Sequence, residues 1–150
     1  MVKIINKHIY STKTATFIGD YSNNLDENDE QYIYESLYLR REGGFFLYCK
    51  GGAKTMYSQK INNKRVAGED IDMLSFDEAQ EWGKSHLSTD AYDRFFNLDK
   101  ETKTSKSDRQ TFTVRLPEEY IRKLKIAKSK TNLKYPELFT RMIDTFMKSI

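Results

Sequence analysis

Side chains suited to redox chemistry or metal binding are scarce in this chain. Its 150 residues include one cysteine and two histidines. A single cysteine, Cys49, excludes an intramolecular disulfide, and its place in an aromatic segment indicates a small buried hydrophobic residue. His8 and His86 have no carboxylate or thiol at ligand spacing nearby. We therefore expect no metal site, no cofactor and no catalytic residues, and the sequence does not predict an enzyme.

Long apolar runs are also lacking. Residues 1–6 never build the apolar stretch of a signal peptide, and no segment approaches the length of a membrane-spanning helix. We expect a cytoplasmic protein without a membrane partner. The length allows one ordinary domain or two small ones.

Charge divides the chain into two halves. Residues 1–98 hold 12 Lys and Arg against 15 Asp and Glu, a net charge of −3, whereas residues 99–150 hold 13 against 7, a net charge of +6. Residues 99–108 contain no apolar side chain, which predicts a flexible linker over residues 99–109 between domains at 1–98 and 110–150. The basic half has the charge expected of a protein that neutralises phosphates.

The first half is predicted to combine a small antiparallel sheet with helices, so the fold class is α+β. We expect strands over residues 2–5, 8–10, 32–40, 44–49 and 70–74. Turns are predicted at Asn6-Lys7 and over residues 41–44, and an exposed loop over 23–30. A helix is expected to begin after Ser11, with Ala15 and Ile18 facing inward.

Two further helices are predicted near the end of this half. Ser75 and Glu78 have the spacing of a capping box, which predicts a helix over residues 76–86, with Ala79 and Trp82 on its buried side. A short helix around residues 91–98 carries three aromatic side chains for docking, Tyr92, Phe95 and Phe96.

Aromatic residues are dense in the predicted strands over 32–40 and 44–49. If only one face of the sheet is core, the other face exposes rings of a kind favoured at protein interfaces. This candidate partner surface consists of Tyr32, Tyr34, Tyr38, Phe46 and Tyr48. The alternative is that these rings belong to an ordinary core and a helix-covered sheet, and the sequence leaves both interpretations open.

A short alternating segment begins the basic half. Its polar side chains are Thr111, Thr113 and Arg115, and the apolar ones between them are Phe112, Val114 and Leu116. No second strand pattern follows, so the strand lacks a partner in its own half. A unit of about 40 residues is also near the size that needs disulfides, metal or oligomerisation to fold. We therefore predict that two copies pair these strands into an antiparallel ribbon.

Two amphipathic helices are predicted after this strand. Pro117 with Glu118 and Glu119 marks the start of the first, and a break at Thr131-Asn132 ends it. The second, from about Tyr135, carries the cleanest apolar stripe in the chain. The predicted dimer core joins this stripe to the strand and consists of Phe112, Val114, Leu116, Leu138, Met142 and Phe146.

Residues 110 to about 147 resemble the ribbon-helix-helix DNA-binding proteins, the family of MetJ and Arc. In that family the paired strands enter the major groove. The resemblance implies that Thr111, Thr113 and Arg115 face the base edges, where Arg can bind guanine O6 and N7. A strand and two amphipathic helices also occur in many α+β domains in which a threonine-rich face is merely solvated, and this alternative stays open.

The family also binds a phosphate on backbone N–H groups at the start of the second helix. The corresponding positions here are Asn132, Lys134 and Tyr135. This chain departs from the family pattern, because Lys134 occupies the place of the usual Ser, Thr or Asn cap and Pro136 removes one N–H donor. The positive charge of Lys134 can replace part of that contact.

The first half is similar to small proteins of plasmids and phages of low-GC Gram-positive bacteria. The residues that carry this similarity are 3–6, 21–23, 44–48, 51–53 and 76–82. Some domains of this kind occur in anti-CRISPR proteins that act on type II Cas nucleases, and a DNA-binding domain fused to such an inhibitor commonly represses its own operon.

Two functions are therefore open. The first is a homodimeric repressor of a mobile genetic element, which binds double-stranded operator DNA and carries an N-terminal protein-interaction domain. The second is an inhibitor of a Cas9-type nuclease or its guide RNA complex, with the C-terminal domain repressing the operon. An antitoxin is a weaker alternative, because antitoxins usually place this fold first.

Overall fold

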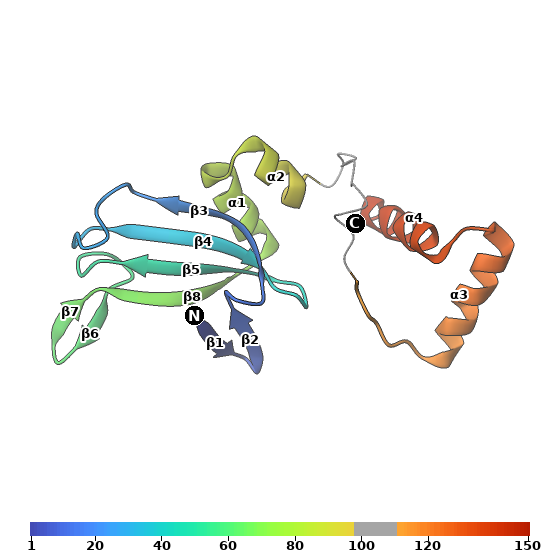
Figure 1. Cartoon of the computed structure of the whole chain (residues 1–150), viewed down its shortest axis with the longest axis horizontal. Helices are drawn as coiled ribbons and strands as arrows, with labels where there is room; N and C mark the ends of the chain where they lie inside the picture. The colour runs from blue at the N-terminus through green and yellow to red at the C-terminus, as the bar shows by residue number, and fades with distance from the viewer. Residues whose placement is uncertain (98–110) are drawn as a thin grey trace. The chain divides into compact units, whose positions relative to one another are not determined.

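The computed structural model describes residues 1–97 and 111–150. The chain divides into two compact units, Met1–Lys103 and Thr104–Ile150, called here the N-terminal unit and the C-terminal unit (Figure 1). The predicted linker over residues 99–109 lies outside the described residues. Antiparallel sheets and the four helices of the described residues make the fold class α+β, as predicted.

A four-stranded antiparallel sheet forms the centre of the N-terminal unit. Its strands, in spatial order, are β3 (Thr16–Ser22), β4 (Ile33–Leu39), β5 (Phe45–Gly51) and β8 (Gly68–Leu74). The β4–β5 turn contains Gly43 and Gly44, both at φ 92°, a left-handed conformation that glycine adopts readily. The predicted strands over 32–40, 44–49 and 70–74 and the turn between the first two are confirmed.

Two helices cover one face of this sheet (Figure 1). They are α1 (Phe76–His86) and α2 (Thr89–Phe96). Ser75 and Glu78 form the predicted capping box at the start of α1. The core beneath the helices consists of Ile18, Leu37, Leu47, Cys49, Ala79, Trp82 and Phe96. The helix over residues 76–86, the short helix after it and the burial of Cys49 are confirmed.

A two-stranded hairpin packs against the opposite face of the sheet. Its strands are β1 (Val2–Ile5) and β2 (His8–Ser11), as predicted, and Asn6 and Lys7 form the turn with positive φ. Tyr10 on β2 meets the ring of Phe46 edge-on, at 5.6 Å between centroids. Phe46 is 0% exposed, so its prediction as part of an exposed partner surface is wrong. The hairpin that covers Phe46 is distant from it in the sequence, so no local pattern around Phe46 could indicate that this residue is buried.

The helix predicted after Ser11 is also wrong, because residues 16–22 form β3. Ala15 and Ile18 are three residues apart, which mimics a helical period, whereas Thr16, Phe17 and Ile18 are types that favour strands. Pairing with β4 favours the strand over the helix. The register shifts between Phe17 and Gly19, and Ile18 is buried in the core as expected.

A second hairpin extends from the sheet and was not predicted. It consists of β6 (Gln59–Ile61) and β7 (Lys64–Val66), joined by Asn62 and Asn63 at φ 47° and 62°. Two Asn residues with positive φ between short strands are typical of the tight turns that join hairpins. The dipeptide Asn62-Asn63 was therefore the feature of the sequence from which this hairpin could have been predicted.

A carboxylate joins three parts of the N-terminal unit. Glu35 on β4 accepts a hydrogen bond from Trp82 Nε1 at 2.6 Å and another from the Tyr57 hydroxyl. Burial, together with the hydrogen bond to Glu35, raises the pKa of Tyr57. Burial raises the pKa of the adjacent Cys49 thiol to about 12. Glu35 thus links β4 to α1 and to the segment before β6 through hydrogen bonds.

The described residues of the C-terminal unit form two helices of equal length, α3 (Glu118–Thr131) and α4 (Tyr135–Lys148). Asn132 ends α3 in the left-handed conformation, at φ 54°, which confirms the predicted break. In the parts of the chain that the structure describes, no helix is long and apolar enough to cross a membrane.

Candidate nucleic-acid interface

Residues 111–117 lead into α3 and form neither helix nor strand in the single chain. Val114 and Leu116 line a groove of about 460 Å³ together with residues from both helices, among them Leu124, Phe139 and Met142. Phe112 is not part of that lining, and it is 82% exposed. The apolar side of the segment is therefore only partly covered within its own unit.

The predicted base-reading residues alternate with these apolar residues along the segment. Thr111, Thr113 and Arg115 are all exposed. No described residue makes a hydrogen bond or ion pair with any of their side chains. Their hydroxyl and guanidinium groups are accordingly available to an external partner.

The predicted phosphate-binding residues meet at the corner between α3 and α4. Lys134 is the first residue before α4, and no side chain caps that end of the helix. Lys128 of α3 lies over the ring of Tyr135, with Nζ 4.3 Å from its centroid, a cation–π geometry. The Lys128 side chain therefore lies beside Tyr135 at this corner, a position that the sequence did not indicate.

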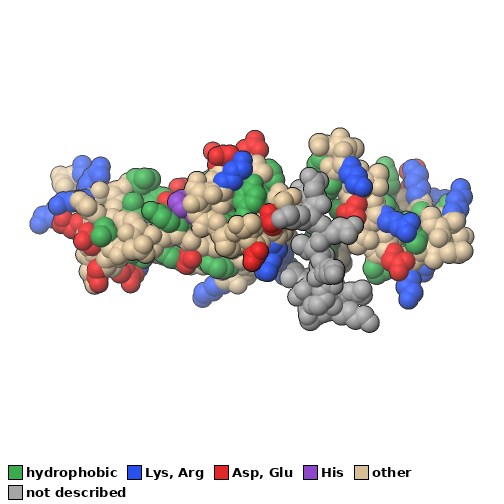
Figure 2. All heavy atoms as spheres, turned by 90° about the horizontal axis from the view of Figure 1, so that it is seen from above, with side chains coloured by type: hydrophobic (Ala, Val, Ile, Leu, Met, Phe, Trp, Pro, Cys, Tyr) green, Lys and Arg blue, Asp and Glu red, His purple; other side chains and the backbone are tan. Residues whose placement is uncertain are grey.

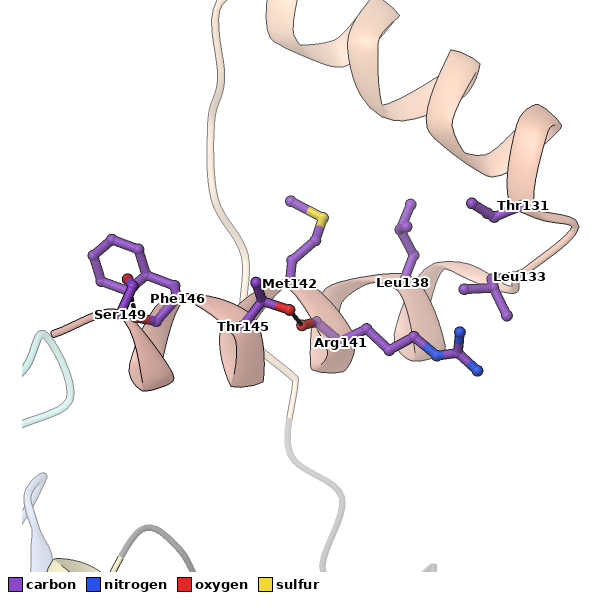
Figure 3. A pocket seen from close by; sticks show the side chains of 8 residues that line it. All are labelled: Thr131, Leu133, Leu138, Arg141, Met142, Thr145, Phe146 and Ser149. Carbon is purple, nitrogen blue, oxygen red and sulfur yellow. Dashed lines mark hydrogen bonds between the residues drawn. The ribbon is translucent and has the colours of Figure 1, made fainter.

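A second groove, of about 620 Å³, runs along α4 and the preceding connection (Figure 3). Leu138, Met142 and Phe146 line it with Thr131, Leu133 and Arg141 among others. Leu138 is buried at 6% exposure, whereas Met142 and Phe146 are exposed. Five of the six predicted dimer-core residues therefore line two grooves, and Met142 belongs to both.

Positive charge dominates the described part of this unit. Residues 111–150 hold 9 Lys and Arg against 4 Asp and Glu. Within this range Glu119 and Lys123 form an ion pair at 3.1 Å. Glu118 and Glu137 lie in the first turns of α3 and α4, where the helix dipole favours them. The other eight cations form no ion pair with a described carboxylate.

No family model, curated protein or solved structure matches this chain. Its own residues are therefore the basis for inferring its function.

The candidate partner surface of the N-terminal unit is smaller than predicted. Phe46 is buried, and Tyr38 stacks on it at 5.2 Å between centroids. Tyr34 donates a hydrogen bond to Asp20 at 3.2 Å, and Tyr48 donates one to Glu69. Burial and these carboxylate contacts raise the pKa of both hydroxyls. The remaining surface is half-buried and consists of Tyr32, Tyr34, Tyr38 and Tyr48. The hydroxyl groups of Tyr34 and Tyr48 already form hydrogen bonds within the unit.

Proposed function

We propose that this chain is a dimeric, sequence-specific DNA-binding protein of the ribbon-helix-helix type, which acts in the cytoplasm as a transcriptional repressor. The observation that supports the proposal is the segment over residues 111–116, whose side chains alternate beside two helices that leave their apolar stripe largely exposed. A second copy is the partner that would cover this surface and supply the missing neighbouring strand.

Pairing of two such segments would bury Phe112, Val114 and Leu116 from each copy. Each side chain contributes roughly 2 kcal/mol when it is fully buried. The backbone N–H and C=O groups of the segment would gain hydrogen-bond partners at the same time. Dimerisation is thus favoured by the same residues that remain exposed in one chain.

The ribbon would then turn Thr111, Thr113 and Arg115 away from the helices. The major groove of B-DNA is wide enough for a two-stranded ribbon, and each base pair presents a distinct pattern there. Lys128 and Lys134, beside the start of α4, are placed for the phosphate contacts that fix such a ribbon in its groove.

The test is a mobility-shift assay of the purified protein on the DNA upstream of its own gene and on a scrambled duplex of equal length and composition. We expect tighter binding to the upstream duplex, with log K falling linearly as log salt rises. Equal affinity for the two duplexes at every salt concentration would contradict the proposed function.

A second candidate, which rests on the similarity of the first half to domains of anti-CRISPR proteins, is inhibition of a Cas9-type nuclease by the N-terminal unit. This unit has two core clusters of its own and the acidic half of the chain's charge, so it is suited to act without the C-terminal unit. Residues 1–98 alone should then block target cleavage by the nuclease as well as the full chain does. If residues 1–98 alone bind no operator and do not inhibit the nuclease, the repressor alone is favoured.

A further inference from the structure

The β6–β7 hairpin concentrates positive charge in a unit that is otherwise acidic. Its residues 59–66 include Lys60, Lys64 and Arg65 and no acid. Without them, residues 1–98 would hold 9 cations against the same 15 acids. All three cations are exposed. Figure 2 shows Lys and Arg side chains, with Asp and Glu side chains beside them, at the end of the unit that carries β6 and β7 in Figure 1.

None of the three cations is neutralised within the described residues. Lys3, Lys50, Lys54 and Lys84 of the same unit each pair with a carboxylate. Arg65 reaches only the Ser58 hydroxyl, at 3.3 Å, a contact that brings no negative charge. Lys60 lies directly opposite Arg65 across the hairpin. Two like charges at such a position destabilise a hairpin, so an anion bound between them would stabilise it.

The hairpin contributes nothing to either core cluster, yet its base is fixed to the sheet. Gln59 donates a hydrogen bond to the Glu69 carbonyl of β8 at 3.1 Å. A Cβ atom at Gly68 would lie 2.4 Å from the Tyr57 carbonyl oxygen, so glycine is what lets the chain pass this closely. The hairpin is therefore held in place although the core does not require it.

The neighbouring acids form no ion pair with Lys60, Lys64 or Arg65 among the described residues. The acidic loop over residues 25–30 joins β3 to β4 at the same end of the sheet as the hairpin, which leads into β8 at the opposite edge. Glu27 and Glu30 of that loop are paired with Lys50 and Lys54. The carboxylate closest to the hairpin in sequence, Glu69, accepts a hydrogen bond from the Tyr48 hydroxyl.

We propose that the β6–β7 hairpin is a second DNA contact, in which Lys60, Lys64 and Arg65 bind phosphates of the duplex held by the C-terminal unit. The inference rests on the proposed function, because that unit supplies the DNA. Lysine is depleted at protein interfaces but common at phosphates, and the hairpin has no aromatic anchor for a protein partner. Since both units belong to one chain, the second contact forms at high effective concentration.

The test compares two full-length variants from which the same charge is removed. The hairpin variant carries Lys60→Gln, Lys64→Gln and Arg65→Gln. The control variant carries Lys7→Gln, Lys13→Gln and Arg41→Gln, three exposed cations in turns away from the hairpin. Affinity for the upstream duplex is measured between about 50 and 200 mM salt, the range in which counterion release is marked.

We expect the affinity of the hairpin variant to fall at least tenfold, with the slope of log K against log salt reduced by about 0.9 for each phosphate that is no longer neutralised. The control variant should keep the wild-type slope. A third variant, Lys60→Arg, Lys64→Arg and Arg65→Lys, retains the charges and should also keep it. Circular dichroism of all variants verifies that the unit remains folded, as expected for exposed residues outside the core.

Four other results would each contradict a DNA contact by the hairpin, and they differ in what they leave standing. A wild-type slope in the hairpin variant, combined with a preference for the upstream duplex, removes the second contact and leaves the proposed function standing. Equal decreases in the hairpin and control variants assign the effect to net charge. A hairpin-dependent slope on an RNA duplex alone assigns the hairpin to RNA, and failure of the wild-type protein to bind any DNA overturns both proposals.

Discussion

The two units differ in how much of their apolar surface each covers by itself. In the N-terminal unit, ten hydrophobic residues are buried, arranged on both faces of one sheet. Among the described residues of the C-terminal unit, Leu138 alone is buried, and eleven large hydrophobic residues are exposed. Both units lie on one chain and have similar helical segments, so the difference lies in what surrounds the helices.

The apolar stripes of the helices are covered to different extents in the two units. Helices α1 and α2 place their aromatic residues on a sheet that their own chain provides, as when Phe96 stacks on Phe45 at 5.4 Å. Among the described residues of their unit, helices α3 and α4 have only residues 111–117 beside them. The first unit should therefore be stable as a monomer, whereas the stability of the second should depend on a partner.

The largest effect is expected from Phe46→Ala, which should lower the free energy of unfolding of the N-terminal unit by about 3 to 5 kcal/mol, because it opens a cavity beneath the β1–β2 hairpin. The chain's one tryptophan, Trp82, is buried in this unit, so urea unfolding followed by its fluorescence reports on this unit alone. The matched control is Phe17→Ala, at a residue that is 51% exposed, for which a decrease of about 1 kcal/mol is expected. Equal decreases in the free energy of unfolding for Phe46→Ala and Phe17→Ala would contradict the placement of Phe46 in the core.

Next in size is Phe112→Lys, which should convert the protein to a monomer and abolish operator binding, because a charge would have to be buried in each half of the dimer. Light scattering during gel filtration measures the mass. In the wild-type protein, the melting temperature of the helical signal should rise with protein concentration, while that of the Trp82 signal stays constant. A dimer that survives the substitution would show that residues 111–116 do not form its interface.

A smaller effect is expected from Arg115→Ala, which should weaken operator binding by about 1 to 3 kcal/mol and relax the preference at one base position in each half-site. Lys134→Ala serves as the comparison, since removing a phosphate contact should weaken binding equally on operator and random DNA. Binding is measured on both kinds of duplex for each variant. If Arg115→Ala weakens both equally, Arg115 does not read bases.

The smallest change concerns Cys49, whose thiol should not react with an aromatic disulfide reagent at pH 8 in the folded protein. Burial raises its pKa to about 12, so the reactive thiolate is nearly absent at the lower pH of the assay. One thiol per chain should become reactive when urea unfolds the N-terminal unit, and at a lower urea concentration in Phe46→Ala. Rapid labelling of the native protein would show that this core opens readily.

Local signals in the sequence predicted most of the helices and strands. The capping box of Ser75 and Glu78 located α1, and the glycines before β5 located its hairpin, because caps and tight turns depend on neighbouring residues. The β3 strand was missed because its pairing with β4 is a contact between distant residues. Phe46 was misplaced for the same reason, since the hairpin that covers it lies at the other end of the unit's sequence.

The candidate interface was predictable in part. The alternation over 111–116 and the helix break at Asn132 follow from periodicity and backbone preference. The position of Lys128 over the Tyr135 ring depends on how α3 turns into α4, which spacing along the chain does not give. The β6–β7 hairpin was missed because each strand has only three residues, too few for a clear alternation.

The carboxylate of Glu35 has a consequence for how the sheet assembles. If β4 slipped by one residue against its neighbours, this acid would turn to the face occupied by Phe46, and the donors Trp82 and Tyr57 would be left without their acceptor. Misaligned sheets are thus destabilised on both faces at once. A single polar side chain in the middle of an aromatic sheet thereby reinforces the strand alignment that the apolar residues of the two faces favour.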